Sequence, residues 1–164
     1  MPSPENCRTT SISFSKDVIL GRISNKLEVW PYWRSTMITA FYCSLLAVWL
    51  FILSIRVIGL RGNPAFAFIA QGSGDEELLQ RAIRAHGNLT EYAPMMMIVL
   101  YLLETTGAES SALHLLGGSF LIGRLMHGVC MGFMRSSMPL RVGGTALTLF
   151  PLLGGAVTLL IQLV

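Results

Sequence analysis

The polar side chains between residues 77 and 92 have the types and the spacing of a ligand-binding surface. At about 100° per residue, a helix places six of them within an arc of about 100°. They are Glu77, Arg81, Arg84, Asn88, Glu91 and Tyr92. This mixture of cations, anions, an amide and a phenol suits a zwitterionic ligand that carries carboxylates and an amine. The alternative is a salt-bridge stripe that joins helices, since Glu77 and Arg81 form an ordinary i,i+4 pair.

A second group of polar residues interrupts the apolar sequence further along the chain. Arg124 and His127 have i,i+3 spacing, which puts both side chains on one face of a helix, and Met131 follows one turn later. A single histidine on an apolar helix is usually a satisfied core residue, but the arginine beside it favours a site. Arg141 directly precedes the last apolar segment. It is expected in the same half of the bundle as the polar arc, and a guanidinium close to a thiol stabilises the nucleophilic thiolate.

The composition of the chain indicates a membrane environment. Hydrophobic residues make up 52% of the 164 residues and charged residues 13%, whereas a soluble domain has about 25% charged residues. The polar surface is therefore too small to cover a water-exposed globule, and the lipid bilayer is the predicted partner. The net charge of +3 comes with no Lys/Arg run, so no nucleic acid partner is predicted. The three cysteines are too scattered for a disulfide framework, and no metal site is predicted.

Four predicted helices must position the candidate site residues. Segments 37–58 and 142–164 are long and apolar enough to span a bilayer, which takes about 20 residues. Segment 112–134 qualifies if its arginine and histidine face protein or water. Residues 75–104 predict one helix of about 45 Å, polar in its first half and apolar in its second. Short links between these helices predict an all-α, integral membrane four-helix bundle with up-down-up-down topology that forms an oligomer.

The distribution of basic residues predicts the orientation of this bundle. Outside residues 1–36, all seven basic residues lie near the first and third loops; they are Arg56, Arg61, Arg81, Arg84, Arg124, Arg135 and Arg141. The positive-inside rule then makes these two loops cytoplasmic and puts the C-terminus on the opposite side. Residues 1–36, with five more basic residues, are expected to be a disordered or interfacial N-terminal extension. Because those charges oppose the rule, the alternative is that translation starts at Met37.

Residues 81–94 read Arg-Ala-Ile-Arg-Ala-His-Gly-Asn-Leu-Thr-Glu-Tyr-Ala-Pro. This string resembles the signature of the MAPEG family, the membrane-associated proteins of eicosanoid and glutathione metabolism, and the resemblance covers residues 37–164. It implies a homotrimer of four-helix protomers that binds glutathione between neighbouring subunits in the cytoplasmic half. In family enzymes the glutathione thiol, a co-substrate group, becomes the nucleophile for a lipophilic small molecule drawn from the bilayer.

The resemblance also assigns roles to individual residues. The positions that hold glutathione in family enzymes correspond to Arg84, Asn88, Glu91 and Tyr92. His127 matches a ligand-contacting His or Tyr, and Arg141 matches the arginine that stabilises the thiolate. Arg56 resembles a further glutathione-binding arginine, with Arg61 as the competing candidate. Arg81 and Arg124 are expected to support the site.

Two positions depart from the family pattern. Met131 stands where a tyrosine is expected, and Val142 follows Arg141 where the prostaglandin branch has a serine. Both weaken a case for specialised eicosanoid chemistry, but neither forbids glutathione binding. The sequence therefore predicts a glutathione-binding membrane protein with transferase or peroxidase activity on lipophilic electrophiles. The alternative is a non-enzymatic protein of the same fold, whose polar face serves assembly or binds another anion.

Overall fold

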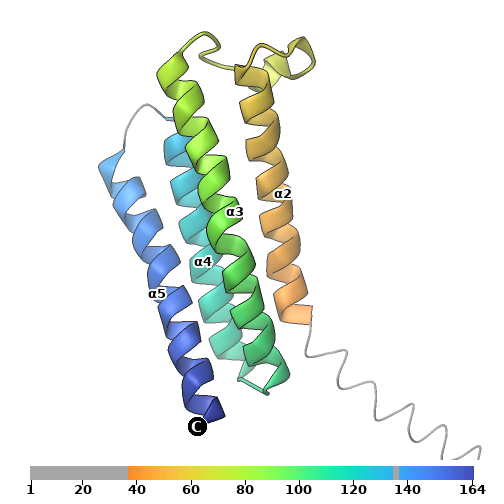
Figure 1. Cartoon of the computed structure of the whole chain (residues 1–164), viewed down its shortest axis with the longest axis vertical. Coiled ribbons are helices and arrows are strands. Elements are labelled where there is room, and N and C mark those ends of the chain that lie inside the picture. The colour runs from red at the N-terminus through yellow and green to blue at the C-terminus, as the bar shows by residue number, and fades with distance from the viewer. Residues whose placement is uncertain (1–36, 135–136) are drawn as a thin grey trace, which may run out of the picture. The chain divides into compact units, whose positions relative to one another are not determined.

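The computed structural model of the protein describes residues 37–134 and 137–164 (Figure 1). The expected N-terminal extension, residues 1–36, lies outside the described residues. Four long helices and one short 3₁₀ helix make up the described part of the chain. They are α2 (Met37–Leu60), η1 (Pro64–Ile69), α3 (Glu76–Thr105), α4 (Ser110–Gly132) and α5 (Met138–Leu163). Every element in these ranges is helical, so the predicted all-α class is confirmed.

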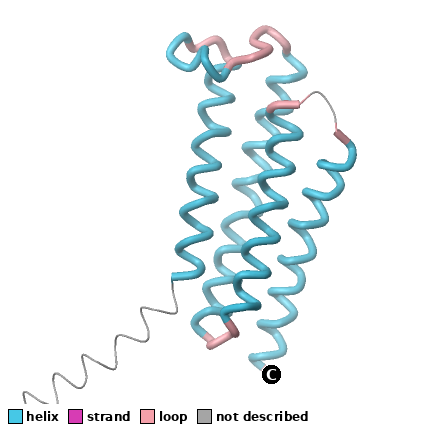
Figure 2. Tube along the Cα trace, turned by 180° about the vertical axis from the view of Figure 1, so that it is seen from behind, coloured by secondary structure: helices cyan, strands magenta, loops and turns pink. Residues whose placement is uncertain are grey.

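The four long helices lie side by side and alternate in direction along the chain (Figures 1 and 2). Helix α4 packs against α2, α3 and α5, and α3 also packs against α2 and α5. The end of α2, η1 and the start of α3 lie at the same end of this group as the end of α4 and the start of α5 (Figure 1). The α3–α4 turn and the C-terminus lie at the other end. Charged residues from α3, α4 and α5 can therefore meet near the first of these ends.

Local sequence signals explain where α3 begins and ends. The Asp75 side chain caps the helix by accepting a 3.1 Å hydrogen bond from the Leu78 N–H, and Glu76 and Glu77 favour the positive end of the helix dipole. At the other end Gly107 adopts a φ of 85°, a left-handed conformation that suits glycine just beyond a helix. The single long helix predicted over residues 75–104 is thus confirmed.

A buried carboxylate joins the start of α2 to the end of α3. Glu104 is 3% exposed and accepts hydrogen bonds from the backbone N–H groups of Ile38 and Thr39, each at 3.0 Å. These N–H groups have no partner within their own helix, and a negative charge there complements the dipole of α2. The contact therefore fixes the spacing of α2 and α3 at the end where the α3–α4 turn lies.

Three of the four long helices have the length and apolar composition of membrane spans: α2, α4 and α5. Helix α3 carries the polar half that the sequence predicts. Between the helices a core of fully buried apolar side chains includes Leu53, Met96, Leu100 and Phe120. Large apolar side chains also face outward, among them Phe51 on α2, Leu115 on α4 and Phe150 on α5. Apolar groups on the outside as well as the inside are typical of helices surrounded by lipid.

Candidate functional site

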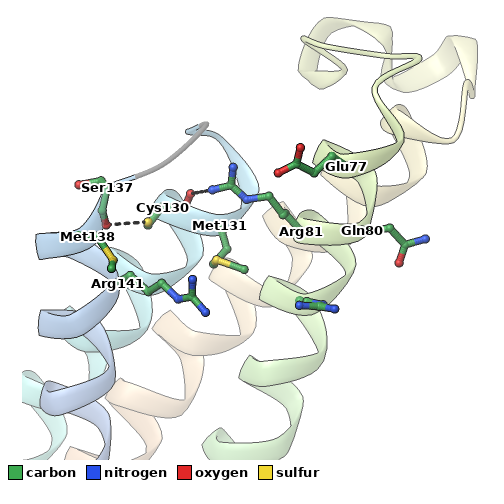
Figure 3. A pocket seen from close by; sticks show the side chains of 9 residues that line it. Glu77, Gln80, Arg81, Cys130, Met131, Ser137, Met138 and Arg141 are labelled. Atoms are coloured by element: carbon green, nitrogen blue, oxygen red, sulfur yellow. Dashed lines mark hydrogen bonds between the residues drawn. The ribbon is translucent and has the colours of Figure 1, made fainter.

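Two adjoining pockets lie between α3, α4 and α5 and share Arg84, Met131 and Arg141. One has a volume of about 380 Å³ and extends past Glu77, Arg81, Cys130 and Ser137. The other has a volume of about 280 Å³ and extends past Gly87, Asn88, Glu91 and His127. Figure 3 shows Arg81 reaching from α3 toward Cys130, and Arg141 extending from α5, with Met131 between them. We call the two together the arginine pocket.

The arginine pocket brings together most of the site residues predicted from the sequence. Six of the nine line it: Arg81, Arg84, Asn88, Glu91, His127 and Arg141. They come from three helices and span 60 positions of the chain. The polar arc predicted for α3 therefore faces a real cavity. The remaining three residues, Arg56, Tyr92 and Arg124, do not line it. The roles of all nine, as catalytic, ligand-binding or supporting residues, stay predictions.

The backbones of α4 and α5 are in direct contact beside this pocket. A Cβ atom built on Gly144 would lie 2.9 Å from both the Gly123 carbonyl oxygen and the His127 backbone nitrogen. A Cβ atom on Gly123 would lie 2.8 Å from the Leu147 backbone. No side chain fits at either position. The contact sets the distance between His127 on α4 and Arg141, one turn before Gly144 on α5.

Arg124 of α4 is only 3% exposed, does not line the pocket and forms hydrogen bonds to α3. Its Nη1 donates to the backbone oxygen of Asn88 at 3.2 Å and to the Asn88 side-chain oxygen at 3.1 Å. Its guanidinium carbon lies 5.5 Å from the centre of the Tyr92 ring and 6.0 Å from that of Phe120. These are cation–π distances. The Tyr92 ring thus covers a buried cation in the protomer.

Arg56 is almost fully buried, at 2% exposure, and binds backbone carbonyl groups. Its Nε donates to the Gly132 oxygen at 3.0 Å and its Nη2 to the Gln71 oxygen at 2.8 Å, and its Nη1 also donates to the Ile69 oxygen. The guanidinium carbon lies 5.1 Å from the centre of the Phe133 ring. The competing candidate, Arg61, is exposed at the end of α2. Arg56 therefore ties α2 to the α2–α3 connection and to the end of α4.

Carbonyl groups at the C-terminal end of α4 accept hydrogen bonds from arginines of other helices. Helix α4 has no basic residue in its last turn, and the last carbonyls of a helix lack partners within it. Arg56 of α2 binds the Gly132 oxygen, and the Nη2 of Arg81 from α3 donates to the Cys130 oxygen at 3.0 Å (Figure 3). Two cations also complement the negative end of the α4 dipole. Because these contacts join residues far apart in sequence, no local pattern could have indicated them.

The charges around the arginine pocket determine what it can bind. Arg84 and Arg141 make no side-chain hydrogen bonds within the described part of the chain and remain available to anionic groups. Glu91 offers a carboxylate that can accept from an ammonium group, and Asn88 and His127 add further polar atoms. Within residues 37–134 and 137–164, no group of three or more His, Cys, Asp or Glu side chains could hold a metal ion. The chemistry available is binding of an organic ion and electrostatic stabilisation of an anion.

Comparison with known proteins agrees with this architecture. The sequence model of the MAPEG family matches residues 39–161. The chain is 40% identical over 91 residues to the inner membrane protein YecN of Escherichia coli K12. That match covers 56% of this chain and 67% of the E. coli protein. YecN of the E. coli strain CFT073 matches to the same extent. No solved structure matches the chain significantly.

Proposed function

The chain belongs to the MAPEG family and is an integral membrane protein, and on that premise we propose that it binds glutathione in the arginine pocket. One observation carries the proposal: Arg84 and Glu91 of α3, His127 of α4 and Arg141 of α5 surround one cavity. Glutathione has two carboxylates, an ammonium group and a thiol. The guanidinium groups of Arg84 and Arg141 complement the carboxylates of this ligand in sign, and the carboxylates of Glu77 and Glu91 complement its ammonium group.

The proposed reaction begins with the glutathione thiol held near Arg141. The thiol releases its proton to water, and the guanidinium stabilises the thiolate, the form of sulfur that acts as a nucleophile. The thiolate attacks an electrophilic carbon, a thioether bond forms, and the leaving group takes the electron pair of the bond that breaks. A groove of about 630 Å³ along α5, lined by Val142, Leu149 and Phe150, also includes Arg141. An apolar groove beside the proposed thiolate supports a lipophilic electrophile that enters from the bilayer.

The proposed assembly is a trimer of four-helix, up-down-up-down protomers. Glu77, Arg84 and Glu91 are exposed on the α3 surface of the single protomer, and α3 is not among the helices apolar enough to span alone. Charged side chains at membrane depth need protein or water around them. Neighbouring subunits that pack on α3 would supply that cover and would close the open side of the arginine pocket. The positive-inside rule supports a cytoplasmic location of the α2–α3 and α4–α5 connections.

Ligand-dependent stabilisation of the detergent-purified protein tests this proposal. A ligand at 100 times its Kd stabilises the folded state by about 2.7 kcal/mol, so glutathione should raise the Tm by several degrees. An equimolar mixture of free glutamate, cysteine and glycine, which has the same net charge and the same side chains but no peptide links, is the control and should have little effect. An unchanged Tm at millimolar glutathione would contradict the proposal.

A non-enzymatic role in the same fold is the second candidate. Its support is Met131, which lines both parts of the arginine pocket and offers no hydroxyl donor. In this case glutathione or another anion binds, but its thiol is not activated. Near-ultraviolet absorbance of the glutathione-loaded protein separates the two candidates. A thiolate band at neutral pH supports the enzyme, whereas binding without that band supports the non-enzymatic role.

A further inference from the structure

Arg124 faces Asn88 in a way that determines which atoms Asn88 can present to a ligand. We propose that Arg124 is a positioning residue, which holds the Asn88 carboxamide with its oxygen toward α4 and its NH₂ group available to a carboxylate in the arginine pocket. The inference rests on the proposed function, because it takes glutathione as the ligand.

The chemistry of the two side chains dictates the orientation of the amide. A guanidinium group has five N–H donors and no acceptor. Arg124 Nη1 lies 3.1 Å from the Asn88 side-chain atom that faces it, so this atom has to be the oxygen. An amide is planar, and its NH₂ group therefore points away from Arg124. A flipped amide would place N–H donors against the buried guanidinium.

Several contacts hold Arg124 and Asn88 in fixed positions. The same Nη1 atom also donates to the Asn88 backbone oxygen at 3.2 Å, so one guanidinium nitrogen holds both the helix backbone and the side chain. Tyr92 and Phe120 pack on the guanidinium at cation–π distances. Arg124 is 3% exposed and Asn88 only partly exposed. Both groups thus have little freedom to find other arrangements.

The Asn88 NH₂ group then has no acceptor among the described residues and is available to a ligand. Asn88 lines the pocket beside Arg84 and Arg141, and within the described residues its side-chain nitrogen donates no hydrogen bond. A polar group that is partly buried without a partner costs free energy, which a ligand acceptor recovers. The hydrogen bonds of Arg124 also go to neutral oxygens, so its positive charge adds to the attraction for an anion. The amide donor and the nearby guanidinium groups together select a carboxylate at this point of the pocket.

The substitution Asn88→Asp separates this role from a structural one. The carboxylate keeps an oxygen against Arg124, so the Tm without ligand should stay unchanged or rise. Its second oxygen replaces the NH₂ donor and repels a ligand carboxylate, so the Kd for glutathione should increase by about 10²-fold, the cost of losing a hydrogen bond to a charged group. Asn63→Asp makes the same chemical change at an exposed position outside the pocket and should leave the Kd unchanged.

Substitutions of Arg124 test the positioning step itself. Arg124→Lys keeps a cation and a donor for the Asn88 oxygen, so the Kd should rise less than about tenfold. Arg124→Gln offers both a donor and an acceptor, which lets the Asn88 amide flip, and its Kd should rise more than that of Arg124→Lys. Isothermal titration of the full-length, detergent-purified protein with glutathione gives these values, and thermal unfolding without glutathione gives the matching Tm values.

The outcomes distinguish this inference from the proposed function. Wild-type protein that binds no glutathione overturns both. If the wild type binds but Asn88→Asp binds equally well, the proposed function stands and the positioning role is wrong. The role is also wrong if Arg124→Lys and Arg124→Gln lower the Tm and leave the Kd at the wild-type value, since that result is expected of a purely structural arginine.

Discussion

The close approach of α4 and α5 leads to a sharp prediction for two neighbouring glycines. A Cβ atom at Gly144 would lie 2.9 Å from the Gly123 oxygen and from the His127 backbone nitrogen, whereas ordinary contacts of a Cβ atom begin at 3.4 Å. Both neighbours are backbone atoms of α4, so they cannot rotate away. Gly144→Ala therefore pushes α5 away from α4 by about 0.5 Å. At Gly143 the nearest atom is the flexible Met126 Cε, at 3.0 Å, which can move at little cost.

The two alanine variants should differ in stability although they lie next to each other. Both gain about 1 kcal/mol from replacing glycine with alanine in a helix. Only Gly144→Ala also incurs a cost of about 1–3 kcal/mol for overpacking. Its Tm should therefore be roughly 5–10 °C below that of Gly143→Ala, measured by thermal unfolding in the same detergent.

Glutathione binding gives the functional half of the same test. Arg141 lies one turn before Gly144, so a displaced α5 moves its guanidinium relative to His127. We expect the Kd for glutathione to increase in Gly144→Ala and to stay near the wild-type value in Gly143→Ala. Equal Tm values for the two variants would refute the packing argument. Different Tm values with equal Kd values would refute only the link between this contact and the pocket.

Three other experiments test separate parts of the structure. Arg141→Ala should shift the titration of the bound thiol to higher pH and lower turnover by about 10²–10³-fold with a smaller effect on Kd; superimposable absorbance titrations would contradict its role. Arg56→Met should lower the Tm strongly, because three backbone carbonyls, that of Gly132 in a buried contact, lose their donor. Arg56→Lys should recover part of the loss. The orientation in the membrane can be tested in intact cells that express a variant without the native cysteines. Glu109→Cys in this variant should react with a membrane-impermeant thiol reagent, and Ala65→Cys should not. The reverse pattern would show that the α2–α3 connection faces outward.

The helices and the polar arc of α3 could be predicted from the sequence because their signals are local. An acidic first turn, good helix formers and a fixed angle per residue are enough to define α3 and the side that carries Arg84, Asn88 and Glu91. The same arithmetic places Tyr92 at the edge of the arc. In the structure the Tyr92 ring lies over Arg124, outside the residues that line the pocket. Glu91, at the opposite edge of the arc, does line the pocket, so the neighbouring helix decides what a residue at either edge contacts.

The role of Glu104 could not be predicted, for a physical reason. A carboxylate in the last turn opposes the dipole of its own helix, so within α3 it contributes nothing favourable. Its partners are the first N–H groups of α2, more than 60 positions earlier. The contacts of Arg56 could not be predicted either, because its three carbonyl partners belong to the α2–α3 connection and to α4. Such contacts depend on tertiary packing, and one sequence does not indicate them.

Five arginines at one end of the helices differ in their partners, and this difference determines the charge around the arginine pocket. Three of them have hydrogen bonds to neutral oxygen atoms of the protein: Arg56, Arg81 and Arg124. Such bonds orient a guanidinium but leave its charge uncompensated, so these residues add positive potential around the pocket. Arg84 and Arg141 face the cavity itself, where Glu91 offsets only part of the charge. A ligand with a net negative charge is therefore attracted there, and conversion of a thiol into a thiolate strengthens that attraction.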